Sequence, residues 1–165
     1  MVKPDWLHVD PPVGSGNENV NVGAQEHTGR TNRSGTITFK AAGVSDASVS
    51  LTQTAKAEFV QIADISVQKE GGSVTITGKS NSAKLNFKLG AGELFISLPS
   101  SYLAGGINTA NNVYIAGDPG ADAEYDFSLT FNAPENTSTE TKRREIIVRT
   151  EGGQSARSII SQVPY

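Results

Sequence analysis

The stretch VNVGAQEHTGRTNRSGTITFK (residues 20–40) decides the fold, because it recurs in altered form near the other end of the chain. Shifted by 109 residues, positions 20–53 lie without a gap over positions 129–162. Seven of the 34 aligned pairs are identical, and they stand among pairs of like chemistry such as Val22 with Phe131. Apolar residues align in alternating segments and small or polar residues align between them. The sequence therefore contains an internal repeat, which is the first feature to settle.

Alternation of apolar and polar residues with a period of two recurs along the whole chain and is typical of an all-β sandwich. Glycine and proline turns separate the alternating segments. Strands are expected near Trp6–Val9, Val20–Ala24, Gly35–Lys40, Ser48–Thr52, Ile65–Gln68, Ser73–Gly78, Lys84–Leu89, Leu94–Leu98, Val113–Ala116, Tyr125–Asn132, Glu145–Thr150 and Arg157–Gln162. The stretch LPSSYLAGG (98–106) has room for one helical turn.

The alternation also predicts which side chains face the core. In YDFSLTFN the inward set is Phe127, Leu129 and Phe131, and in SVTITGKS it is Val74 and Ile76. The first copy of the repeat closes at residue 53, and a new alternating series begins after TAKAE (54–58). We expect a short unit over residues 1–56 and a fuller unit over residues 57–165.

Composition excludes several classes of protein. The chain has 165 residues, 36% of them apolar, a net charge of −3 and no cysteine. No run approaches the ~18 apolar residues of a transmembrane helix, and the start MVKPDWLHVDPP lacks the apolar region of a signal peptide. The missing cysteines exclude disulfides, a thiolate nucleophile and a lipid-anchor cysteine. Scattered charges favour neither nucleic acid nor membrane as a partner. If Met1 is native, the protein is made and kept in the cytosol.

Residues for catalysis or metal binding are not grouped in the sequence. His8 and His27 have no partner at ligand spacing, and both are expected to face solvent. The stretch GGSVTITGKS (71–80) has the wrong glycine spacing for a phosphate-binding loop and is expected to form a hairpin arm. Four acidic residues without calcium-loop spacing favour an acidic turn over a calcium site: Asp118, Asp122, Glu124 and Asp126. No catalytic residue, cofactor or metal is predicted.

Both copies share one order of elements: an alternating strand, an A-x-E-[HN]-T loop, a basic residue, a second strand, a glycine turn, and a strand that closes on glutamine. This order resembles the C-terminal half of the BACON-type immunoglobulin-like module. The matching residues are Val20, Val22, Ala24, Thr28, Arg33, Gly35, Ile37, Phe39, Val49, Leu51 and Gln53, preceded by Trp6, and then Leu129, Phe131, Ala133, Asn136, Lys142, Ile146, Val148, Ile160 and Gln162. The resemblance implies an all-β fold of two immunoglobulin-like β-sandwich domains, the N-terminal one abbreviated. Ile115 aligns with Trp6, which weakens a sugar-binding role in the second copy.

BACON-type modules occur in glycan-degradation proteins of gut Bacteroidetes and in virion proteins of crAss-like phages that infect those bacteria. The bacterial proteins usually carry a leader with an anchor cysteine or adjoin a catalytic domain, and neither is expected here. The resemblance therefore favours a bacteriophage structural protein, an auxiliary (decoration) capsid protein that docks on the capsid shell and is no enzyme. Its location would be the virion, or the bacterial surface if a leader was removed. The alternatives are a carbohydrate-binding module that attaches phage or a bacterial surface complex to glycans, and a hydrolase accessory domain.

The abbreviated first unit suggests how such a protein would bind. A unit of about 55 residues buries only ~60% of its unfolded surface and leaves strand edges unpaired. We expect the major capsid protein, another virion protein, a neighbouring copy or the C-terminal unit to complete it by edge pairing and apolar contact around Trp6, Leu7, Pro11 and Pro12. In the glycan alternative, Trp6, Tyr102 and Tyr114 would stack on a sugar, although packing of Trp6 into a small core or an interface is favoured.

Overall fold

The computed structural model describes residues 1–165 and contains thirteen strands and no helix. The strands are β1 (Leu7–Asp10), β2 (Asn21–Ala24), β3 (Arg33–Phe39), β4 (Ala47–Gln53), β5 (Val60–Ile62), β6 (Ile65–Val67), β7 (Gly72–Ser80), β8 (Leu85–Gly92), β9 (Ser101–Ala104), β10 (Ile107–Ala110), β11 (Tyr125–Ala133), β12 (Lys142–Thr150) and β13 (Ser155–Gln162). The predicted all-β class is confirmed. No helical segment able to cross a bilayer is present.

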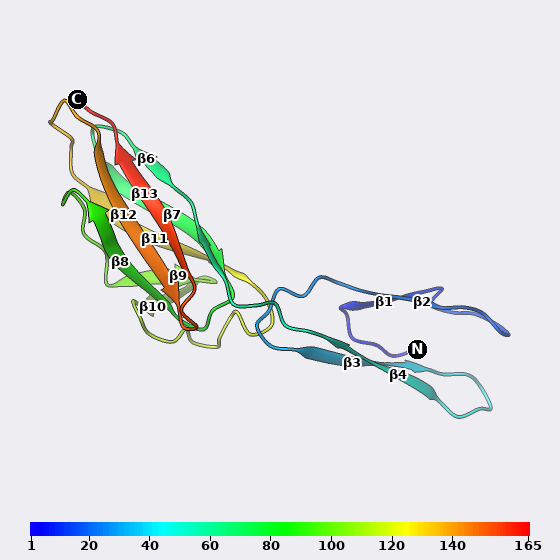
Figure 1. The fold of residues 1–165 in the computed structure, drawn as a ribbon. Helices are drawn as coiled ribbons and strands as arrows, with labels where there is room; N and C mark the ends of the chain where they lie inside the picture. Colours follow the sequence, from blue (N-terminus) through cyan, green and yellow to red (C-terminus); the bar gives the residue numbers. More distant parts are fainter.

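The C-terminal unit is a β-sandwich. One sheet has the order β10-β9-β11-β7-β5, and the other has the order β6-β13-β12-β8. All neighbours are antiparallel except β6 and β13, which run parallel. Figure 1 shows this sandwich at one end of an elongated molecule, with the C-terminus at its far tip.

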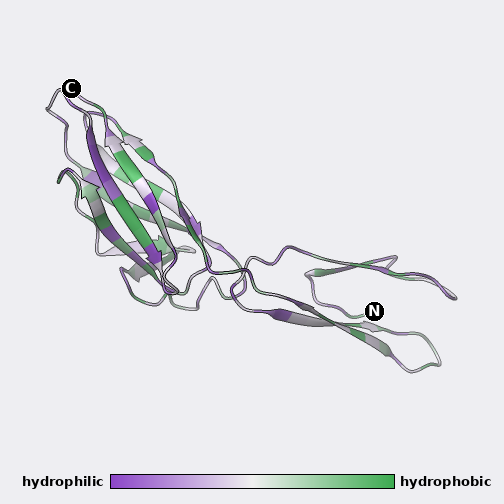
Figure 2. Ribbon diagram, viewed as in Figure 1, coloured by the Kyte–Doolittle hydropathy of each residue, from purple (hydrophilic) through white to green (hydrophobic).

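Side chains from both sheets fill one core between them. Strand β11 buries every second residue, so Phe127, Leu129 and Phe131 face inward as predicted. Val74 and Ile76 of β7 meet them in the same core of 18 buried residues. Figure 2 shows the hydrophobic segments concentrated in the strands of the sandwich, whereas the N-terminal strands are paler. Burial on this scale is enough to hold the sandwich together.

The N-terminal unit has two separate two-stranded sheets, β1-β2 and β3-β4. They extend from the sandwich as two arms (Figure 1). Three buried residues lie between the arms, namely Leu7, Val9 and Ile37. Three partly buried side chains pack against this cluster, namely Trp6, Phe39 and Leu51. The expectation of an abbreviated N-terminal sandwich is confirmed.

The internal repeat is visible in the strand register. Arg33 pairs with Gln53 across β3 and β4, and Lys142 pairs with Gln162 across β12 and β13. Each residue of the first pair lies 109 positions before its counterpart. The closing glutamines also make equivalent bonds: Gln53 Nε2 donates to the carbonyl of residue 25 at 3.0 Å, and Gln162 Nε2 donates to that of residue 134 at 2.7 Å. The same local geometry therefore ends both units.

His27 occupies the position of a buried asparagine in this repeat. Asn136 Nδ2 donates to the Glu140 carbonyl at 2.9 Å, and His27 Nε2 lies 2.5 Å from the equivalent carbonyl, that of Thr31. His27 is buried, so the expectation that it faces solvent is wrong. The reason is that the loop needs a side-chain donor at this position, which the imidazole supplies. His8 on β1 is exposed, as expected.

Several predicted elements differ from the observed ones. The segment Leu94–Leu98 is no strand, because it carries the chain from one sheet to the other, with Leu94 86% exposed and Ile96 buried. Val113–Ala116 contributes only a single bridge, from Tyr114 to Lys84. The expected helical turn in residues 98–106 is strand β9, followed by a two-residue Gly105–Gly106 turn into β10. Strands β5, β9 and β10 were not predicted.

Candidate functional site

A network of hydrogen bonds fixes the base of the arms to the sandwich. The amides of Arg30 and Thr31 donate to the carbonyls of Gly120 and Ala121, each at 2.9 Å. Asn81, fully buried, accepts from the Phe59 amide at 3.0 Å and donates to the carbonyls of Thr28 at 3.3 Å and Ala57 at 3.2 Å. This arrangement holds the arms in a defined direction relative to the sandwich.

The acidic segment GDPGADAEYD (117–126) lies at this junction. Asp118 forms a partly buried ion pair with the Arg30 guanidinium, which also donates to the Asn81 carbonyl. Glu124 lies 3.6 Å from Lys56 Nζ and 3.2 Å from Lys79 Nζ. These carboxylates are thus neutralised by cations and connect the two units.

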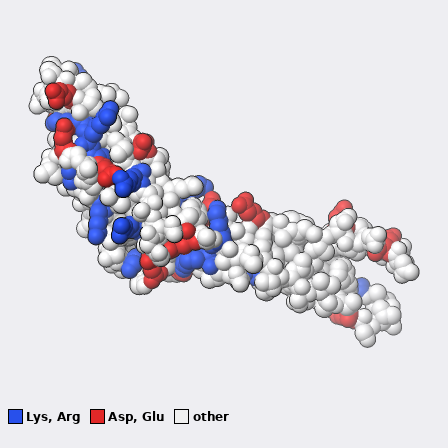
Figure 3. All heavy atoms as spheres, viewed as in Figure 1, with Lys and Arg blue, Asp and Glu red and all other residues white.

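The distal end of the arms contains the candidate binding site. A cleft of about 360 Å³ opens between the β1–β2 connection and the end of β3. It is lined by Met1, Pro11, Pro12, Val13, Gly14, Ser15, Gly16, Glu18, Val20, Phe39 and Lys40. In Figure 3 the distal end is split into two lobes that carry separate small groups of charged atoms, while larger groups of charge lie on the sandwich and at its junction with the arms. We call this opening the distal cleft.

Exposed apolar side chains occur in the lining of the distal cleft and elsewhere on the arms. Val13 and Val20 line the cleft and are 83% and 39% exposed, and Val44 and Val2, outside its lining, are 66% and 61% exposed. The arms bury only three residues in their core, so several of their apolar side chains remain in contact with solvent. An apolar surface of this kind on a small domain is typical of an interaction site.

The residues predicted to dock on a partner fall into two groups. Pro11 and Pro12 are exposed and line the distal cleft. Leu7 is fully buried, so it cannot touch a partner while the fold is intact and supports the site from within. Trp6 is partly buried against the same small core, and the Arg33 guanidinium covers its ring at 4.5 Å from the ring centroid. Gly35 makes room for the indole, because a Cβ there would lie 2.8 Å from Trp6 Cζ2.

The other aromatic candidates do not form a common surface with Trp6. Tyr102 is 3% exposed, and its hydroxyl accepts a hydrogen bond from the Leu85 amide at 3.2 Å inside the sandwich. Burial raises the pKa of Tyr102. Tyr114 is 59% exposed, but Lys84 Nζ lies 4.9 Å from its ring centroid and its hydroxyl donates to Glu151. Tyr114 is therefore the most exposed of these three aromatic residues, with one side of its ring beside the Lys84 ammonium.

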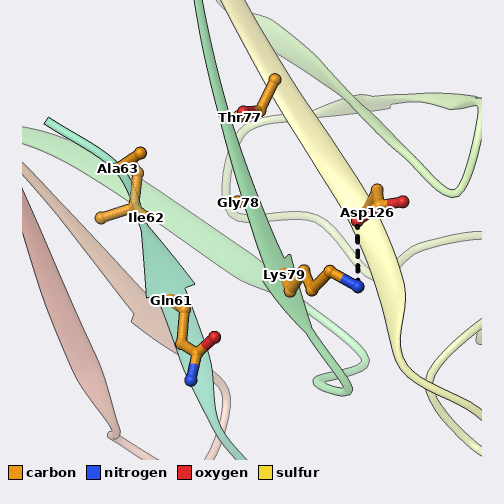
Figure 4. Close-up of a pocket in the computed structure, with 7 residues that line it drawn as sticks. All are labelled: Gln61, Ile62, Ala63, Thr77, Gly78, Lys79 and Asp126. Atoms are coloured by element: carbon orange, nitrogen blue, oxygen red, sulfur yellow. Dashed lines mark ion pairs between the residues drawn. The ribbon is translucent and has the colours of Figure 1, made fainter. Parts of the chain in front are cut away.

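A surface depression of about 640 Å³ lies on the sandwich where β5 ends beside β7. Figure 4 shows Lys79 reaching toward Asp126 across it, with Gln61, Ile62 and Ala63 on the opposite side. A hydrogen bond to Glu124, together with the charge of Asp126, raises the pKa of Lys79. The ammonium stays protonated at neutral pH and is thus unsuited to act as a nucleophile or base.

The exposed apolar residues of the distal cleft were not predicted individually. The turn sequence PPVGSG (11–16) marks the loop, and Pro11 and Pro12 were found by this signal. Val13 was not predicted as a binding residue, because the turn signal gives no information about which side chains of the loop form a cleft. Phe39 is half-buried, packs against the small core of the arms and also lines the cleft.

Residues 1–54 match the family model BACON, described as "Putative binding domain, N-terminal". The predicted resemblance to this immunoglobulin-like module is confirmed over these residues, which include all four strands of the arms. All the residues that line the distal cleft lie within the matched range.

Among solved structures, the chain is similar to the zebrafish RET cadherin-like domains 1 to 4. The identity is 10%, the TM-score is 0.39, and the match covers 81% of this chain. The chain spans about a third of that protein, 34% of its length. No curated protein sequence matches this chain.

Proposed function

We propose that this protein is a non-catalytic structural component of a bacteriophage particle, an auxiliary (decoration) capsid protein. Its N-terminal unit docks on the major capsid protein or another virion protein, and the sandwich projects outward. The observation that carries this proposal is the distal cleft, an opening with the exposed apolar side chains of Val13 and Val20 in a half-module that lacks the strands to close it. The phage setting comes from the BACON resemblance.

The contacts at the junction support an anchoring role. Arg30, Thr31 and Asn81 fix the arms to the sandwich, so a partner bound at the distal cleft would also orient the C-terminal unit. Binding energy would come from covering Val13 and Val20 in the distal cleft. Assembly of the particle would leave the protein in the virion after synthesis in the host cytoplasm.

The test measures the protein in purified virions and its rebinding to them. We expect a stoichiometric copy number by quantitative mass spectrometry, and we expect added wild-type protein to co-sediment with particles stripped of it. Val13→Asp should abolish co-sedimentation, because it puts a charge on the distal cleft. Val113→Asp is the matched control, since Val113 is 51% exposed on the sandwich. Absence from virions, or equal binding of both variants, contradicts the proposal.

Carbohydrate binding is the second candidate, and the exposed ring of Tyr114 is the observation that favours it. An exposed aromatic ring can stack on the apolar face of a sugar. Saturable binding on a glycan array that Tyr114→Ala abolishes and Val13→Asp leaves intact would support this function over docking on a capsid. The protein would then sit on the virion or on a bacterial surface.

A further inference from the structure

Strand β4 is an open sheet edge seven residues long. It pairs with β3 on one side, and no other strand lies on its far side. In the C-terminal unit the equivalent strand, β13, has its outer edge covered by the parallel strand β6, with Ile160 opposite Ile65. The repeat thus shows that this edge takes a strand in the complete module and lacks one in the arms.

The other long edges of the molecule are blocked. Thr38 on the outer side of β3 exchanges two backbone hydrogen bonds with Val2, at 3.0 and 2.8 Å. On the outer side of β8, the side chain of Asn111 accepts from the Phe87 amide at 2.8 Å and donates to its carbonyl at 2.9 Å. The edge strands β5, β6 and β10 have only three or four residues. Natural proteins block edges in these ways to prevent pairing between molecules.

The sequence of β4, ASVSLTQ, contains none of these protective features. It has no charged residue and no proline. One face carries the hydroxyls of Ser48, Ser50 and Thr52, which lie 3.0–3.3 Å from hydroxyls of β3. The opposite face carries Val49, which is 50% exposed, and Leu51. Such a strand can form backbone hydrogen bonds with a neighbouring strand, and its side chains on both faces can pair with those of the neighbour.

The strand is also complementary to itself. An antiparallel pair of β4 strands centred on Ser50 would align all seven residues of each copy. Val49 of one chain would lie opposite Leu51 of the other, and Ser48 opposite Thr52. Both the hydroxyl face and the apolar face of the sheet would continue from one copy of the chain to the other, and no like charges would be brought together.

We propose that two copies of this chain associate through antiparallel pairing of their β4 strands, which gives a four-stranded sheet with the order β3-β4-β4-β3. The contact is isologous, with the two-fold axis at Ser50. It is small, so it favours a weak dimer in dilute solution that becomes populated where copies are concentrated on a surface. The inference does not rest on the proposed capsid function, because it uses the β4 edge and not the distal cleft.

Cysteine scanning of the full chain tests the proposal, since the native sequence has no cysteine. Ser50→Cys places one thiol on the two-fold axis, and Thr36→Cys is the matched control on the adjacent strand and the same face. Under mild oxidation at rising concentration, Ser50→Cys should form several-fold more disulfide-linked dimer than Thr36→Cys. Equal cross-linking of the two variants overturns the proposal.

Sedimentation equilibrium supplies a second readout that needs no cross-link. The wild-type protein should show a monomer–dimer equilibrium, and Ser50→Lys should weaken it several-fold by placing two ammonium groups opposite each other. Thr36→Lys should leave the equilibrium near that of the wild type, because the two added charges would be separated by both β4 strands. A wild-type protein that remains monomeric at its highest soluble concentration refutes the β4 pairing. That outcome would leave the Val13→Asp test of capsid docking unaffected.

Discussion

The two isoleucines at equivalent positions of the repeat allow a direct test of how the two units are stabilised. Ile37 on β3 and Ile146 on β12 lie 109 residues apart and are both fully buried. Ile146 belongs to the core of 18 buried residues, whereas Ile37 is one of three. Replacing each with alanine removes the same atoms from two very different surroundings.

The expected cost of each substitution is about 2–5 kcal/mol, from lost burial and the cavity left behind. At ~0.05–0.15 kcal/mol per residue, a unit of the length of residues 1–53 would have about 3–8 kcal/mol of stability and residues 57–165 about 5–16 kcal/mol. The loss is therefore comparable with the whole stability of the arms and smaller than that of the sandwich. We expect Ile37→Ala to unfold the arms selectively, and Ile146→Ala to destabilise the sandwich without unfolding it.

Hydrogen exchange read by mass spectrometry distinguishes these outcomes strand by strand. In Ile37→Ala, the amides of β3 and β4 should exchange at nearly the unfolded rate, while those of β11–β13 stay protected. Thr36→Ala, an exposed neighbour, serves as the control and should match the wild type. Retained protection of β3 and β4 in Ile37→Ala, or loss of protection in both units together, would refute this account.

Three further substitutions test the junction, the sandwich and the Trp6 site. Asn81→Ala leaves buried backbone groups without hydrogen bonds and should lower the free energy of unfolding by about 1–3 kcal/mol. The arms should then take a wider range of orientations relative to the sandwich, measured by small-angle X-ray scattering. An unchanged scattering profile would contradict the role of Asn81 at the junction. Burial raises the pKa of Tyr102 above its reference value of 10.0, so its contribution to the stability of the fold is complete below that pH and is lost as the pH rises through the folded-state pKa. The melting temperature should therefore fall above about pH 10, and it should fall less steeply in Tyr102→Phe than in the wild type. Parallel plots of melting temperature against pH for the two proteins would count against this role. Gly35→Ala would bring a Cβ within 2.8 Å of Trp6 Cζ2, and this overpacking should lower the free energy of unfolding by about 1–3 kcal/mol. The indole would be displaced toward solvent, so the fluorescence of the single tryptophan should shift to the red. An unshifted spectrum would argue against the packing of Trp6 on Gly35.

The strands of the repeat could be predicted because their alternation is long and regular. Phe127, Leu129 and Phe131 alternate with polar residues over the nine residues of β11, and the register of β12 with β13 follows the aligned repeat. Strands β5, β9 and β10 were missed because three or four residues are too few to carry a periodic signal. Their conformation depends on pairing with a longer neighbour, which sequence alone does not reveal.

The site was predictable in location but not in detail. Turn residues marked Pro11 and Pro12 as an exposed loop, and the missing leading strands indicated open edges. Tyr102 is buried because it lies on β9, a strand that the sequence does not predict, so its ring is not available to stack on a sugar. His27 was expected at the surface because nothing in the sequence shows that it takes the hydrogen-bonding role of Asn136.

The near balance of charge on the arms, with four basic and five acidic residues in positions 1–53, has a kinetic consequence. A surface without a strong field cannot draw a partner in from a distance, so encounters at this end should proceed at the basal, diffusion-and-orientation rate. Ionic strength should then have little influence on how fast the molecule is captured, whereas the lifetime of each contact depends on how well its apolar side chains are covered. Such a protein selects its neighbours by residence time and not by speed of arrival.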